Sequence, residues 1–132
     1  MVALQPVGLL VGRILLALIF IISGFNKLTG FAGTASFMAQ HGLPLVPVLL
    51  VLSILVELGG GLLIAVGFKA RWAALAIFLF LIPVTLIFHN FWGVEADQMR
   101  AQMIHFQKNL AIMGGMLYIL FNGPGRYSLD KG

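Results

Sequence analysis

The residue in this sequence that is best suited to take part in chemistry is Glu57, which lies near the middle of an apolar run that begins at Pro44. A carboxylate inside a membrane span costs about 3 kcal/mol on insertion-based scales, so it must be paired, protonated or hydrated. Three consecutive glycines, 59–61, follow close behind it. Small residues let a neighbouring helix approach closely. The stretch therefore places a costly charge at a position of tight helix packing.

Arg13 is the predicted partner of Glu57. Arg13 lies about 9 Å inside the first apolar run and Glu57 about 15 Å inside the second, at a rise of about 1.5 Å per residue from the same membrane face. An arginine side chain can span that difference if the two helices are neighbours, which a short connection favours. Two interpretations stay open: a catalytic, proton- or quinone-coupled carboxylate held by a guanidinium, or a structural ion pair that fixes helix register.

A second group of polar residues is predicted to gather at the opposite membrane face, where three helix ends meet. Its members are Asn26, Lys27, His89, His105, Lys108 and Asn109. Cationic and imidazole groups at one depth suit a quinone head group, an anionic small molecule or an oxyanion. The alternative is that Lys27 and Lys108 snorkel to the interface. His89 and His105 could ligate haem in principle, but no metal-ligand spacing is present, so we predict no metal site.

Positioning these residues requires membrane-spanning helices. Of the 132 residues, 61% are hydrophobic and 9% are charged, against about 45–50% and about 25% in soluble domains. Each of four apolar runs is near the roughly 20 residues that a spanning helix needs. These predicted spans are 7–27, 44–66, 72–91 and 104–121. The sequence thus predicts an all-α, integral membrane four-helix bundle of antiparallel spans, formed by a single domain over 1–132.

The connections and the charges predict the topology. Residues 28–43 are amphipathic and predict a short interfacial helix. Four spans bring both termini to the side of the basic turn that contains Lys69 and Arg71, and the positive-inside rule then places both termini in the cytoplasm. The basic residues are scattered, which argues against nucleic-acid binding. The absence of cysteine excludes disulfides, thiol redox chemistry and iron–sulfur ligation by this chain alone.

Glycine spacing predicts where helices touch. The Gly8-xxx-Gly12 pair, the glycines 59–61 and the Ala111-xxx-Gly115 pair are typical of close helix contacts. We expect these contacts within one bundle, with dimerisation as the alternative, so a homo-oligomer remains open.

In this order and at these distances, the motifs resemble those of the DoxX family of small four-helix bacterial membrane proteins, over almost the whole chain. The resemblance rests on the following segments: Gly12-Arg13, Ser23-Gly-Phe-Asn-Lys27, Glu57-Leu-Gly-Gly-Gly61 with Gly67 and Arg71, His89, Lys108-Asn109, and Gly123-Pro-Gly-Arg-Tyr-Ser-Leu-Asp130.

The resemblance implies a bacterial inner-membrane protein with a redox partner protein, because the family's name derives from the membrane subunit of a thiosulfate:quinone oxidoreductase. We therefore expect a quinone-linked redox subunit, a candidate part of an oxidoreductase, that binds quinone among Lys27, His89, His105, Lys108 and Asn109 while Glu57 exchanges protons. Two alternatives are a transporter for a small solute or anion, and a structural membrane anchor. The anchor would hold a soluble enzyme through Arg126, Asp130 and the basic turn.

Overall fold

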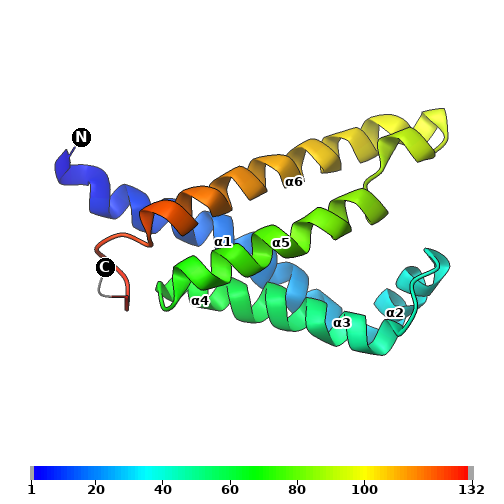
Figure 1. Ribbon diagram of the computed structural model, residues 1–132, viewed down its shortest axis with the longest axis horizontal. Coiled ribbons are helices and arrows are strands. Elements are labelled where there is room, and N and C mark those ends of the chain that lie inside the picture. Colours follow the sequence, from blue (N-terminus) through cyan, green and yellow to red (C-terminus); the bar gives the residue numbers. More distant parts are fainter. Residues whose placement is uncertain (1, 131–132) are drawn as a thin grey trace.

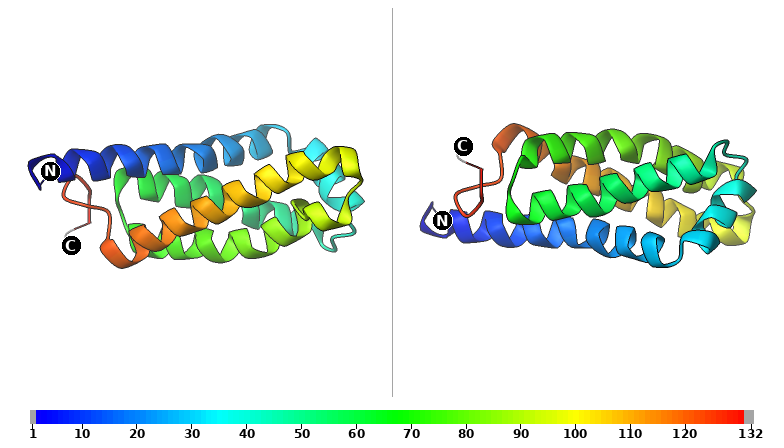
Figure 2. Two further views of the ribbon diagram at one scale, coloured as in Figure 1. Left: turned by 90° about the horizontal axis from the view of Figure 1, so that it is seen from above. Right: turned by 90° about the horizontal axis from the view of Figure 1, so that it is seen from below.

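The computed structural model describes residues 2–130 and consists of four long helical rods joined by short connections (Figure 1). The elements, in chain order, are η1 (Val2–Leu4), α1 (Gln5–Thr29), α2 (Phe31–Gln40), α3 (Val46–Ile54), η2 (Leu55–Gly59), α4 (Gly60–Val66), α5 (Ala70–Phe88), η3 (Phe91–Gly93) and α6 (Ala96–Asn122). Successive rods run antiparallel, and both ends of the described chain lie at the same end of the bundle (Figure 2). The predicted all-α four-helix architecture is confirmed.

The second rod consists of three pieces. Helices α3 and α4 are joined end to end by η2, a single π-helical turn that contains Glu57. The rod ends at Gly67, whose φ of +73° is in the left-handed region that favours glycine. Lys69 also has a positive φ and immediately precedes α5, which gives the tight basic turn expected from the sequence.

Three helical segments in the described chain are long and apolar enough to cross a membrane: Val2–Thr29, Val46–Val66 and Ala70–Gly93. The predicted fourth span, 104–121, corresponds to the later part of α6. Helix α6 begins earlier, at Ala96, so much of the polar segment that was expected to be a connection is helical. Its first half is polar, and this is why α6 is not among the three apolar spans. The predicted interfacial helix within 28–43 is confirmed as α2.

The main core lies where α1, α4, α5 and α6 meet, and it is built of small and branched side chains that include Ala17, Ile64, Ile77 and Met116. A smaller cluster around Met38, Leu50 and Ile54 fixes α2 against α3 at the end away from the termini. Most other large apolar side chains face outward, as expected where the surroundings are lipid.

Candidate functional site

Glu57 pairs with Lys27 and not with Arg13. The Lys27 ammonium donates to the Glu57 Oε1 atom, and the Glu57 side chain is only 4% exposed. Lys27 also lies over the ring of Phe80, with Nζ 5.9 Å from the ring centroid. The predicted Arg13–Glu57 pair is therefore wrong, and the buried carboxylate is neutralised from the other end of α1.

The reason is the way α1 crosses the second rod. Gly24 lies so close to Leu58 that a Cβ atom on Gly24 would be 2.7 Å from the Leu58 backbone nitrogen. This contact brings the last turns of α1 alongside η2. The flexible lysine stem can then turn inward to the carboxylate instead of snorkelling outward. The predicted interfacial position of Lys27 is thus replaced by a partly buried one.

Arg13 instead holds the C-terminal tail. Its guanidinium donates to three backbone carbonyl oxygens: those of Pro124, of Tyr127 at 2.7 Å, and of Ala65 at 3.2 Å. The residue is 4% exposed, and its Nε atom has no hydrogen-bond partner within residues 2–130. Carbonyl dipoles therefore stabilise this buried cation, and the cation fixes the tail against α1 and α4.

The tail residue Asp130 is also engaged within the chain. Its carboxylate accepts hydrogen bonds from the backbone nitrogens of Lys69 at 2.7 Å and Ala70 at 3.0 Å. These nitrogens open α5, where a carboxylate satisfies unpaired N–H groups and favours the helix dipole. Asp130 is thus a helix cap, which removes one of the groups expected to hold a soluble partner, while Arg126 is exposed.

The polar group predicted at the far membrane face does not converge on one point. His89 and His105 face each other with ring centroids 5.0 Å apart, and His89 Nδ1 lies 3.0 Å from Gln102 Oε1. Below them, the buried Asn109 donates from Nδ2 to Thr85 Oγ1 at 3.1 Å. Lys108 is exposed. The result is a polar ladder between α5 and α6, from which Lys27 is separated by its pairing with Glu57.

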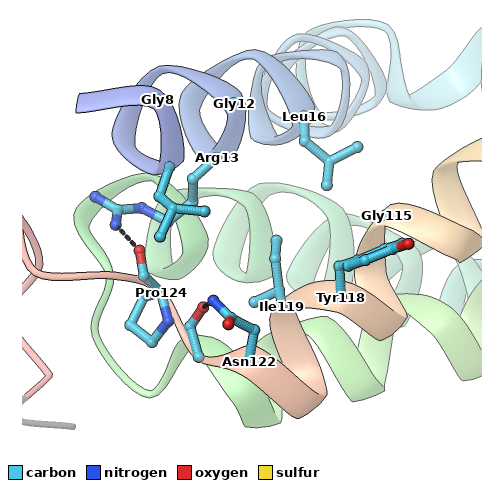
Figure 3. A pocket seen from close by; sticks show the side chains of 11 residues that line it. Gly8, Gly12, Arg13, Leu16, Gly115, Tyr118, Ile119, Asn122 and Pro124 are labelled. Carbon is cyan, nitrogen blue, oxygen red and sulfur yellow. Dashed lines mark hydrogen bonds between the residues drawn. The ribbon is translucent and has the colours of Figure 1, made fainter. Parts of the chain in front are cut away.

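A hollow lies at the other end, between α1 and α6 (Figure 3). This α1–α6 crevice has a volume of about 360 Å³. It is lined by Gly8, Leu9, Gly12, Arg13, Leu16, Gly115, Tyr118, Ile119, Asn122, Gly123 and Pro124. The tail closes one end, where the Arg13–Pro124 hydrogen bond is seen in Figure 3. Sequence reasoning missed the crevice, although three of its glycines were noticed.

The glycines show why the crevice exists. A Cβ atom on Gly8 or Gly12 would meet nothing within 4 Å, so the predicted close contact of this pair inside the bundle is wrong. Gly115 does make the predicted contact, because its Cβ would lie 3.0 Å from Leu16 Cδ2, and Gly60 and Gly61 are likewise tightly packed. Helices α1 and α6 therefore touch near Leu16 and leave an open, glycine-walled space toward the termini.

Chemically, the arrangement offers two separate centres. The crevice combines apolar walls with nitrogen donors from Arg13 and Asn122, which suits an amphipathic molecule with acceptor oxygens. The Lys27–Glu57 pair places a buried carboxylate against a partly exposed ammonium group. The ligand-binding roles predicted for His89, His105, Lys108 and Asn109 stay predictions.

Comparison with known proteins agrees with this architecture. The DoxX family model matches residues 8–90. The inner membrane protein YqjF of Escherichia coli is 42% identical over 128 residues, which cover 97% of this chain and 93% of that protein. The inner membrane protein YphA of the same organism is 37% identical over 129 residues, or 98% of this chain and 92% of that protein.

A more distant similarity reaches eukaryotes. A Surfeit locus protein 4 homolog of Schizosaccharomyces pombe is 34% identical over 71 residues, which cover 52% of this chain and 24% of that protein. No solved structure matches. Because the family model covers more than half of the chain and two relatives match nearly end to end, this multi-pass membrane protein belongs to the DoxX family.

Proposed function

We propose that this protein is the membrane subunit of a quinone-linked redox system and that it binds the quinone in the α1–α6 crevice. The observation that carries the proposal is the crevice itself. Its volume of about 360 Å³ falls in the usual range of small-molecule pockets, about 300–1,000 Å³. It lies between two helices of a membrane bundle, where a lipid-soluble ligand has direct access.

The lining fits the chemistry of a quinone. A quinone head is a flat ring with acceptor oxygens, and its tail is an apolar chain. The bare backbone at Gly8 and Gly12 leaves room for a flat ring, and Leu9, Leu16 and Ile119 supply apolar walls.

Polar donors lie at the closed end of the crevice. Arg13 lines this end and its guanidinium is occupied by backbone carbonyl oxygens, while its Nε atom is buried away from the crevice surface. Among residues 2–130, Asn122 uses Nδ2 for one contact, at 3.3 Å to the Gly123 oxygen, and so keeps a second N–H for a ligand. An acceptor oxygen of a head group would accept this N–H of Asn122.

In this proposal the chain binds and orients the quinone, and the electrons that reduce the quinone come from a redox partner protein. Quinones accept two electrons and two protons, whereas a chain without cysteine has no thiol or iron–sulfur centre of its own. The relation of the family to a thiosulfate:quinone oxidoreductase supports a redox partner protein. The printed names of YqjF and YphA support a bacterial inner membrane as the location. The bias of Lys69, Arg71 and Arg126 toward one end supports cytoplasmic termini.

Filling the crevice tests the proposal. Gly12→Leu would place a side chain in open space that the ligand is proposed to occupy, so the fold is kept and binding is lost. Gly114→Leu is the matched control, because a Cβ at Gly114 also meets nothing within 4 Å and Gly114 does not line the crevice. We expect purified wild type and Gly114→Leu to retain quinone and Gly12→Leu to lose at least about 90% of it.

Three results would overturn the proposal. Equal quinone retention by Gly12→Leu and wild type would place any quinone elsewhere. Wild type that carries only phospholipid in native mass spectra, and that fails to bind an added short-tailed quinone, would make the crevice a lipid site. Cross-linking of cysteines at position 8 between two copies would make it a dimer contact.

A further inference from the structure

We propose that the Lys27–Glu57 pair is a proton-exchange site that opens to the membrane face opposite the termini. It is independent of the α1–α6 crevice, which lies toward the termini. Glu57 is buried, at 3% exposure, whereas the Lys27 side chain is 27% exposed. The lysine therefore links an enclosed carboxylate to the outside of the bundle.

Lys27 is the charged group that faces Glu57. The elements packed against η2 are α1, α3, α4 and α5. Helices α3 and α4 contain no ionisable side chain, and α5 contains only Arg71, which donates to carbonyl oxygens at the end of α6. The other cation of α1, Arg13, is bound to carbonyl oxygens. The charge state of Glu57 is thus coupled to the position of one lysine.

Outside Lys27 lies a surface trough of about 560 Å³ along α1. Its polar members, Ser23, Asn26 and Thr34, surround Lys27 at the end where α1 meets α2. Hydroxyl and amide groups at this depth can hold water, and the rest of the trough is apolar. A lysine that leaves Glu57 therefore finds hydrogen-bond partners within reach of its four-carbon stem.

The turn that carries Glu57 is unusually wide. Residues Leu55–Gly59 form a π-helical turn, and such turns frequently occur at functional sites. Gly59 has open space around its Cβ position. The Gly59 side of η2 is therefore not packed against a neighbouring helix, whereas the Leu58 side is held against Gly24.

The exchange step is a balanced proton transfer. A hydronium ion that reaches the trough gives one proton to a Glu57 carboxylate oxygen and is left as water, and the Lys27 ammonium withdraws into the trough with its charge unchanged. No electron moves. An unpaired carboxylate in the interior costs several kcal/mol, so departure of Lys27 and protonation of Glu57 occur together. The reverse step returns the proton to the same water.

The carboxyl state can be read without altering Glu57. Glu57 and Glu95 are the only glutamates in the chain, and Glu95 is exposed. A Glu95→Gln protein grown with carboxyl-¹³C glutamate therefore reports Glu57 alone, in lipid bilayers, by infrared or solid-state NMR spectroscopy. We expect a protonated carboxylic acid signal to appear on acidification, and Lys27→Met to show this signal already at neutral pH.

A second experiment measures whether water reaches the trough. The chain has no cysteine, so Ser23→Cys and Asn26→Cys each give one thiol in the trough, and the exposed Leu55 (as Leu55→Cys) gives a control on the apolar surface. A membrane-impermeant thiol reagent should label the trough positions, from the side opposite the termini, and not Leu55→Cys. Glu57 that stays ionised at every pH at which the protein is folded would overturn the proposal. So would trough thiols that react no faster than Leu55→Cys.

Discussion

Arg13 holds the C-terminal tail to the bundle, and replacing Arg13 is the most direct test of this role. Residues 123–130 fold back across the end of the bundle. The backbone N–H of Leu129 donates to the Val66 oxygen at 3.1 Å, and that of Asp130 donates to the Gly67 oxygen at 2.8 Å. Arg13 donates hydrogen bonds to two carbonyl oxygens of the tail, those of Pro124 and Tyr127. Arg13→Met keeps an unbranched side chain of similar length and removes all of its hydrogen bonds.

The size of the effect follows from those bonds. A hydrogen bond to a charged group contributes about 1.5–3 kcal/mol, and two of the three bonds go to the tail. Removing the buried charge returns part of its desolvation cost. The expected net loss in tail docking is therefore about 2–4 kcal/mol, which corresponds to a shift of about 30- to 900-fold in the docking equilibrium.

Hydrogen exchange at the Leu129 and Asp130 amides measures that equilibrium. We expect their protection to fall by about 30- to 900-fold in Arg13→Met, while the amides of α5 stay protected. Arg71→Met is the control, because Arg71 donates to the carbonyl oxygens of residues 120–122 at 3.2–3.4 Å and, within the described chain, to none of the carbonyl oxygens of residues 123–130. Unchanged protection in Arg13→Met would refute the claim that this cation fixes the tail.

Two further predictions concern packing and topology. Gly24→Ala should destabilise the bundle by about 1–3 kcal/mol, because the new methyl group meets Leu58 backbone atoms and forces α1 away from η2. Gly114→Ala, with open space inside α6, should not lower the unfolding midpoint in detergent, because alanine is the better helix former. In intact bacterial cells, an impermeant thiol reagent should label Ser36→Cys on α2 and spare Gln5→Cys, since α2 lies at the end opposite the termini; the reverse pattern would place the termini outside.

The fold was largely predictable because it depends on features that a sequence displays directly. Apolar runs of about 20 residues set the rods, and glycine at 67 and the basic turn set one reversal. The start of α6 was not predictable from hydropathy. Its first turns are polar, and a helix that packs on α5 without being apolar gives no span signal. The π turn was equally hidden, because nothing in Leu55–Gly59 distinguishes it from an α-helix.

The site was predicted by residue type but not by pairing. Glu57, Arg13 and Lys27 were all singled out, yet depth along a helix axis gave the wrong partner for the carboxylate. Depth along the axis ignores the direction in which a side chain leaves the helix and the inward reach of a lysine, and it takes no account of the C-terminal tail. The tail supplies the carbonyl oxygens that Arg13 needs. Hydrogen-bond acceptors that are backbone atoms cannot be recognised from the pattern of side-chain types in a sequence.

These two pairings depend on one another. A buried guanidinium needs hydrogen-bond acceptors, and the carbonyl oxygens of Pro124, Tyr127 and Ala65 provide them. Arg13 therefore needs no carboxylate partner. Glu57 is left with a single cation, which is partly exposed and can leave. A permanently charged arginine at this position would lock the carboxylate in its ionised form. In the proposed proton exchange, the division of the two cations between tail and carboxylate is therefore what leaves Glu57 free to take up a proton.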